Sequence, residues 1–203
     1  MGNEFKKKTM RLSTLSSGRL RHLRQVVFFV MEGKNTEPAY FDWLKTNGWI
    51  SSRFALRLDR STGATDAKNL LRRAERLRKS NPDAVVCIIL DKDRNSQDSI
   101  NELYQWQSNH PKNCKVAVSF QKFELFLLMH YGEVFGVKTP SEIDSKMELV
   151  EPGYGRKKIP KMKNRTRQDL EREISLAQSK VNQLPDKDVS QIAALVQWLI
   201  SAE

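Results

Sequence analysis

The chain has 203 residues and 39% of them are hydrophobic, so it is long enough for one sizeable core with an added region. Its formal net charge of +11 favours a polyanionic partner, meaning nucleic acid or an acidic membrane surface. The apolar runs are far shorter than the about 20 residues of a membrane span, so we expect nucleic acid as partner and no membrane association.

The cysteines and histidines bear on the cellular compartment. Cys87 and Cys114 have no pairing pattern and the three histidines are scattered, so neither a zinc site nor a disulfide framework is expected. The basic N-terminus has no apolar segment after it, so no secretory signal is expected. These features together predict a cytoplasmic protein.

Residues 1–24 are predicted to form a basic flexible arm. Seven lysines and arginines face a single acid, Glu4, and the segment has too little apolar surface to fold by itself. The composition fits a frayed terminus as well as a nucleic-acid-binding arm.

Strand and helix patterns alternate from residue 25 onward. Residues 26–31 and 84–90 are continuously apolar and rich in β-branched side chains, which predicts strands buried on both faces. Shorter strands are predicted at 54–58 and 116–120, and helices at 37–46, 67–79, 97–108 and 122–131, with Thr36 capping the first helix. The order predicts an α/β fold with a mainly parallel four-stranded sheet and helices on both faces.

The strand patterns cease beyond about residue 136. The stretch EPGYGRKKIP at 151–160 predicts a loop punctuated by glycine and proline, and helices are predicted at 166–181 and 190–202. We therefore expect an α/β domain at 25–135, followed at 136–203 by a basic loop and helical extension packed on the same domain.

Acids follow both of the strongly apolar strands. Glu32 follows the first, and Asp91 and Asp93 follow the second. In an open α/β sheet the ligand site lies beyond the carboxyl ends of the strands, so these three carboxylates should converge there. Crowded carboxylates repel one another unless a cation neutralises them, and oxygen ligands suit Mg²⁺. The competing interpretation is ordinary turn chemistry, because Asp commonly follows strands.

The residues around these acids suggest further contacts. Residues 32–37, EGKNTE, lack the spacing of a nucleotide-binding P-loop, but they lead into a helix N-terminus where Lys34 could add charge for a phosphate. Glu124 begins an apolar helix, where it either caps the first turn or acts as an outer metal ligand. Ser119 and Lys122 could contact a phosphate, and His130 is expected to pack or bond locally.

Three motifs in this order resemble the RloB-like family, whose members are encoded near restriction–modification and abortive-infection loci. They are a strand ending in EG with TEP two residues on, a later strand ending in DxD, and the segment S-F-x-x-FELxLLxH at 119–130. The resemblance covers roughly residues 25–135, with a weaker echo around Tyr154–Lys158. One departure is the segment before FEL, which is commonly S-N-P-x in the family, whereas this chain has SFQK.

The family in turn resembles Toprim domains, and this resemblance implies Mg²⁺-dependent phosphoryl transfer on nucleic acid, with Mn²⁺ as a possible substitute. It assigns the metal to Asp91 and Asp93, with Glu32 as ligand or general acid/base. The resemblance to the RloB-like family also implies a role in antiviral defence and an ATPase encoded by a neighbouring gene as a partner. The basic run that includes Arg156, Lys157 and Lys158 is then expected to contact phosphates, although such runs commonly face water.

Several functions compete with a nuclease. The same fold could serve as a non-catalytic nucleic-acid-binding protein or as a docking partner of the ATPase. A phospho-acceptor receiver domain also clusters acids after strands, but it has no use for the basic arm or for the second aspartate of DxD. A haloacid-dehalogenase-type phosphatase is disfavoured because residue 95 is asparagine, not threonine or valine.

Overall fold

The computed structural model describes residues 24–59, 66–93, 95–119, 122–131, 139–157, 161–162, 165–180 and 188–201. The predicted basic arm, except for Arg24, lies outside the described residues.

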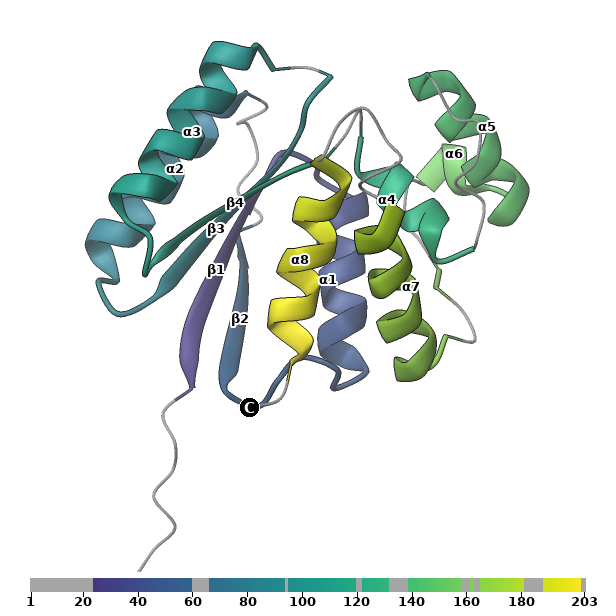
Figure 1. Ribbon diagram of the computed structural model, residues 1–203, viewed down its shortest axis with the longest axis horizontal. Coiled ribbons are helices and arrows are strands. Elements are labelled where there is room, and N and C mark those ends of the chain that lie inside the picture. The colour runs from purple at the N-terminus through teal and green to yellow at the C-terminus, as the bar shows by residue number, and fades with distance from the viewer. Residues whose placement is uncertain are drawn as a thin grey trace, which may run out of the picture.

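A single four-stranded sheet with all strands parallel forms the centre of the described fold (Figure 1). The strand order is β2-β1-β3-β4, with β1 (Gln25–Met31), β2 (Phe54–Asp59), β3 (Val85–Asp91) and β4 (Cys114–Ser119). The central strand β3 is buried from Val85 through Leu90, because helices cover both sides of a parallel sheet. The α/β fold and all four predicted strands are confirmed.

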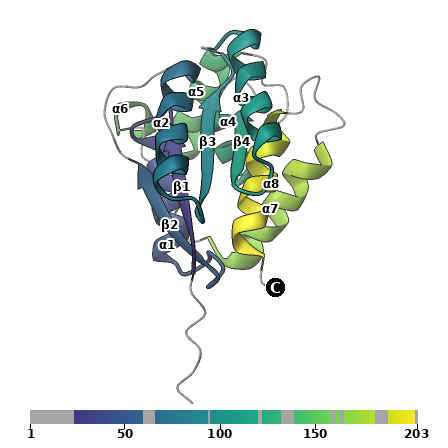
Figure 2. The same ribbon diagram turned by 90° about the vertical axis from the view of Figure 1, so that its left-hand side faces the viewer.

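Helices cover both faces of the sheet, as predicted (Figures 1 and 2). On one face lie α2 (Ala67–Ser80) and α3 (Gln97–Asn109). Their side chains share a core with the alternate residues Val86, Ile88 and Leu90 of β3. On the other face lie α1 (Thr36–Thr46), α4 (Phe123–Met129) and α8 (Asp188–Ile200), with α7 (Arg167–Lys180) beside them. Among the described residues, no helix is long and apolar enough to cross a bilayer.

The C-terminal region packs on the same core. Ile174 of α7 and Val196 of α8 belong to the buried cluster that contains Phe29 of β1. The side-chain oxygen of Gln191 on α8 accepts a hydrogen bond of 2.9 Å from the backbone N–H of Val118 in β4. The expected helical extension is therefore part of the same compact unit.

Two helices of this region were not predicted. Helix α5 (Pro140–Val150) begins at Thr139, whose side chain forms a capping box with Glu142, but the helix buries only Ile143 and Met147. Helix α6 (Tyr154–Lys157) lies within the stretch for which a loop was predicted, so that prediction is wrong there. The weak apolar periodicity of both segments explains why the pattern did not reveal them.

A buried polar cluster ties α4 to α7. His130 is 1% exposed, stacks on Tyr40, and hydrogen-bonds through Nδ1 to Glu173. Arg165 donates to the other carboxylate oxygen of Glu173 at 3.2 Å. Burial lowers the pKa of His130, so the neutral imidazole is favoured. His130 is thus packed in the core, in agreement with its expected structural role.

We expect Glu173→Gln to lower the free energy of unfolding by about 2 kcal/mol, because it weakens buried charge-assisted hydrogen bonds to Arg165 and His130. Urea unfolding at pH 7 measures this change. Glu171→Gln, on the exposed side of the same helix, is the matched control and should change stability by less than about 0.5 kcal/mol. Equal effects of the two substitutions would contradict the assigned contacts.

Candidate functional site

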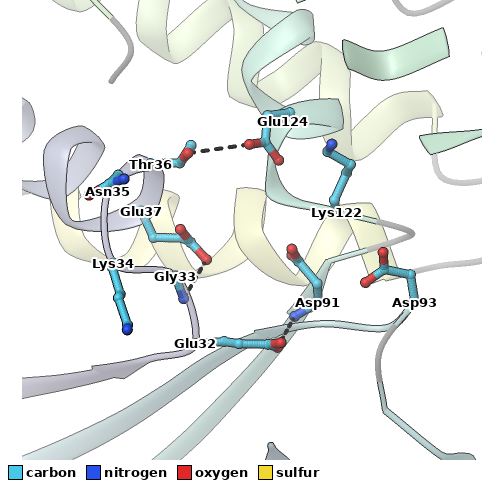
Figure 3. Close-up of a pocket in the computed structure, with 10 residues that line it drawn as sticks. All are labelled: Glu32, Gly33, Lys34, Asn35, Thr36, Glu37, Asp91, Asp93, Lys122 and Glu124. Carbon is cyan, nitrogen blue, oxygen red and sulfur yellow. Dashed lines mark hydrogen bonds between the residues drawn. The ribbon is translucent and has the colours of Figure 1, made fainter. Parts of the chain in front are cut away.

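The carboxyl ends of β1 and β3 bring the predicted acids together. The two strands pair in register, with Met31 opposite Ile89, and the backbone N–H of Glu32 donates to the carbonyl oxygen of Ile89 at 3.1 Å. A pocket of about 230 Å³ opens at this edge (Figure 3). It is lined by Glu32, Gly33, Lys34, Asn35, Thr36, Glu37, Asp91, Asp93, Lys122 and Glu124.

The pocket is lined by six of the predicted site residues of the α/β domain: Glu32, Lys34, Asp91, Asp93, Lys122 and Glu124. Ser119 is not among its lining residues. It lies opposite Asp91 in β4 and is 2% exposed, so its proposed contact with a phosphate is not supported by this geometry. Five carboxylates and two ammonium groups line the pocket, which leaves its lining negatively charged at neutral pH when all are ionised.

Glu32 joins the ends of the two central strands. One of its carboxylate oxygens accepts hydrogen bonds of 3.2 Å from the backbone N–H of Asp91 and from the side-chain amide of Asn95. The Asn95 amide also donates to the backbone carbonyl of Asp91 at 2.8 Å. These bonds fix the backbone from which Asp91 projects, so Glu32 has a positioning role in this geometry.

Asp91 is a buried carboxylate that lies among other negative charges of the pocket. Burial raises its pKa well above the ordinary value, and the negative charges of Glu37, Glu124, Glu32 and Asp93 raise it further. Its Oδ1 is buried and has no hydrogen-bond partner among the residues that the structure describes. A carboxylate in these surroundings is stabilised by a bound cation or by a proton.

Glu37 is a pocket residue that the sequence pattern did not single out. It is 4% exposed, and burial is the main cause that raises its pKa to about 7, with contributions from Glu124 and Glu32. Its Oε1 accepts a 3.1 Å hydrogen bond from the backbone N–H of Gly33. A Cβ at position 33 would lie 1.7 Å from Oε2 of Glu37, so a larger residue there would displace this carboxylate. The TEP motif at 36–38 could have indicated Glu37, because it places an acid in the first turn of the helix that follows β1.

Glu124 is held by two hydroxyl groups. Its Oε1 accepts hydrogen bonds from Thr36 Oγ1 at 3.2 Å and from the Tyr154 hydroxyl at 2.8 Å. Burial and the charge of Glu124 raise the pKa of Tyr154, which keeps its hydroxyl protonated as a donor. The prediction that Thr36 caps α1 is wrong. Asn35 occupies the cap position without a side-chain bond, and Thr36 turns into this buried network instead.

We expect Tyr154→Phe to lower the free energy of unfolding by about 1–2 kcal/mol, because a buried carboxylate loses one of its donors. The two hydroxyls of the network lie 2.9 Å apart, so the effect should depend on Thr36. A double-mutant cycle with Thr36→Val, followed by urea unfolding, measures the coupling. Thr36→Ser retains the hydroxyl and is the control. Additive effects of the two changes would contradict the shared network.

The donor chemistry of the pocket fits a hard divalent cation. No group of three or more His, Cys, Asp or Glu side chains is converged in ligating geometry within the described ranges. Mg²⁺ nevertheless needs only one or two carboxylates, because it keeps several waters. Asp91 and Asp93 face into the same space (Figure 3), and the buried Oδ1 of Asp91 is available as an oxygen ligand. The oxygen donors therefore suit Mg²⁺, and Asp91 would be its central ligand.

Comparison with protein-family models gives a match to the RloB-like protein family over residues 27–199. The chain belongs to the RloB-like family. The match includes the C-terminal helices and so extends well beyond the 25–135 segment in which the motifs were found. Neither the search of curated proteins nor the search of solved structures found a match.

In this RloB-like chain, the pocket cations differ in their surroundings. Lys34 is exposed at the rim, whereas the ammonium group of Lys122 forms an ion pair with Asp144 of α5. A residue of the C-terminal extension thus holds one of the two lysines at the site. The Lys122 side chain is 12% exposed and that of Asp144 is 52% exposed, so the ion pair lies at the edge of the pocket with only Asp144 well exposed to solvent.

The basic run of the RloB-like chain extends from Arg156 to Arg167, and its last two arginines have partners within the protein. Arg165 pairs with Glu173 and lies over the ring of Tyr131, and Arg167 pairs with Glu171 and donates to the carbonyl oxygen of Ile200. Both side chains therefore have internal partners. Lys158 lies outside the described residues, as do the side chains of Arg156 and Lys157 on α6.

Proposed function

We propose that this RloB-like protein cleaves phosphodiester bonds of nucleic acid with Mg²⁺, or Mn²⁺ in its place, and that it acts in the cytoplasm in antiviral, abortive-infection defence. The observation that supports the activity is the gathering of five carboxylates around one pocket at the carboxyl edge of a parallel sheet. That edge is where α/β folds bind ligands. The role in defence comes from the resemblance to proteins encoded near abortive-infection loci.

The charged residues that line the pocket have separate roles in the proposal. Asp91 and Asp93 would hold the cation, with Glu124 as an outer ligand. A bound divalent cation would neutralise the scissile phosphate and lower the pKa of an attacking water. Glu32 positions Asp91 through the backbone N–H and Asn95. Lys34 and Lys122 would contact phosphate oxygens of the substrate.

Glu37 is suited to proton transfer in this scheme. In the metal-free protein its pKa is about 7, near the value that suits a general acid or base at physiological pH, and a bound cation would lower this pKa. The N–H of Gly33 holds one carboxylate oxygen, so the orientation of the group is set before substrate binds. Glu37 thereby takes the acid/base role that the Toprim resemblance left open for Glu32.

A second proposal is a non-catalytic function, in which the same fold binds nucleic acid without cleaving it or docks on an ATPase encoded by a neighbouring gene. The observation that favours it is that no three of the described carboxylates converge as metal ligands in this structure. A binding protein with such a pocket would need no catalytic geometry.

The test incubates the purified full-length chain with end-labelled single-stranded RNA, single-stranded DNA and duplex DNA, in the presence of Mg²⁺, Mn²⁺ or EDTA. Parallel reactions include the neighbouring ATPase. We expect cleavage of at least one substrate with Mg²⁺ or Mn²⁺ and none with EDTA. Cleavage that persists in EDTA would refute the metal site, and tight binding without cleavage under every condition would establish the non-catalytic function.

A further inference from the structure

Helix α2 presents a row of three exposed cations to solvent. Lys68, Arg72 and Arg76 follow one another at intervals of four residues, which places them on one side of the helix. With a rise of about 1.5 Å per residue, this α2 row is about 12 Å long. None of the three side chains makes an ion pair with a residue that the structure describes.

The other charged side chains of α2 are engaged internally. Arg73 donates to Asp59 of β2 at 2.7 Å, which fixes the rotation of the helix over the sheet. Glu75 accepts hydrogen bonds from Arg78 and from the indole N–H of Trp106 on α3. The one acid within α2 is therefore bonded to these groups and not to the α2 row. The three cations of the α2 row are therefore not ion-paired with any residue that the structure describes, whereas the other charged side chains of the helix are paired.

This arrangement differs from a helix surface that merely faces water. On α7 the exposed cations are balanced within the same helix, since Arg167 pairs with Glu171 and Arg172 pairs with Asp169. Like charges at intervals of four residues are destabilising by themselves. The α2 row thus has an electrostatic cost that a polyanion would remove on binding.

The packing of α2 decides between the two kinds of polyanion. A basic amphipathic helix binds a bilayer by inserting its apolar face. The apolar face of α2 is not available for this, because Leu70 and Ala74 are 0% exposed and pack in the core shared with Val30 of β1. A helix that offers cations without an apolar face suits the sugar–phosphate backbone of nucleic acid.

The α2 row also begins beside the acidic pocket. The backbone N–H of Ala67, at the start of α2, donates to the side-chain oxygen of Asn95 at 3.0 Å. The amide nitrogen of Asn95 is bonded to Glu32 and to the carbonyl of Asp91. The Lys68 end of the row therefore lies at the carboxyl edge of the sheet, beside the elements that form the pocket.

We infer that the α2 row is the docking surface for the phosphate backbone of the nucleic-acid substrate, with contacts that are independent of base sequence. The inference rests on the proposed function for the identity of the ligand, but it concerns binding and holds whether or not the bound strand is cut.

The test measures fluorescence anisotropy of fluorescein-labelled single-stranded RNA and duplex DNA in EDTA, over a series of KCl concentrations. The test variant combines Lys68→Gln, Arg72→Gln and Arg76→Gln. The control variant combines Lys45→Gln, Lys112→Gln and Arg172→Gln, which are exposed elsewhere and remove the same charge. We expect the test variant to bind about 10-fold or more weakly, with the slope of log K against log salt reduced by about 2–3, and the control to change by less than about 3-fold.

Equal losses in the two variants, unchanged binding by the test variant, or no nucleic-acid binding by the wild type would each overturn the inference. Row-dependent binding to phosphatidylserine vesicles without binding to nucleic acid would also overturn it, in favour of a membrane surface. Should the triple variant have a lowered melting temperature, the single Arg72→Gln and Arg76→Gln variants replace it, each with a slope reduced by about 0.7–0.9.

Cleavage with Mg²⁺, measured on the same three proteins, separates this inference from the proposed function. Row-dependent binding by a wild type that never cleaves would support the α2 row and refute the nuclease. A wild type that cleaves, together with a test variant that binds and cleaves equally well, would refute the α2 row and leave the nuclease intact.

Discussion

Asp91→Asn is expected to lower the rate of Mg²⁺-dependent cleavage by about 10²–10³-fold, because it removes the charged oxygen ligand at the centre of the pocket. The same substitution should raise the melting temperature of the metal-free protein at pH 8. Asp91 is buried among four acids that raise its pKa, so its ionised form destabilises the fold when no cation is bound. A residue that supported only the fold would not combine lost activity with gained stability.

The measurements are cleavage of end-labelled nucleic acid and thermal unfolding in EDTA. Asp83→Asn is the matched control, since Asp83 is exposed near the opposite end of β3 and should leave both quantities unchanged. Isothermal titration with Mg²⁺ and Mn²⁺ provides a readout that is independent of turnover. Undiminished cleavage or undiminished metal binding by Asp91→Asn would refute the assignment of the ligand.

Stability of the metal-free protein is expected to fall as the pH rises from about 4.5 to about 7, and Glu37 is a major cause. Its pKa is raised in the folded state from 4.5 to about 7. The folded state therefore binds the proton more tightly than the unfolded state, which stabilises the fold at low pH. This stabilisation is fully present below about pH 4.5 and is lost as the pH rises through 7, with a total on the order of 3 kcal/mol.

Urea unfolding in EDTA across this pH range measures the effect. Glu37→Gln retains an oxygen acceptor for the Gly33 N–H but cannot ionise, so this variant should lose most of the decline and be more stable than the wild type at pH 8. Added Mg²⁺ should stabilise the wild type at pH 8 as well. Glu102→Gln, at an exposed position on α3, is the control. A pH profile of Glu37→Gln that matches the wild type would contradict the raised pKa.

Much of the fold follows from local pattern. Strand β3 is apolar without interruption because both of its faces are covered, and that property can be read directly from the run VVCIIL. The placement of Glu32 and Asp91 at one edge then follows, because the carboxyl ends of parallel strands meet there. Helix α5 was missed for the opposite reason, since it buries few side chains and its start depends on the capping box at Thr139.

The succession of strands and helices along the chain, the continuous burial of β3, and the placement of Glu32, Asp91 and Asp93 at one edge of the sheet are thus encoded in short-range pattern and chain topology. The roles of Glu37 and Tyr154 are not, because a pKa depends on excluded water and on charges that lie far away along the chain. Tyr154 reaches Thr36 across 118 positions of sequence, and no periodicity records such a contact. The same holds for the basic side chains. Arg165 forms an ion pair with Glu173, whereas the three cations of the α2 row are exposed. Tertiary packing determines which basic side chains lie within reach of an acid.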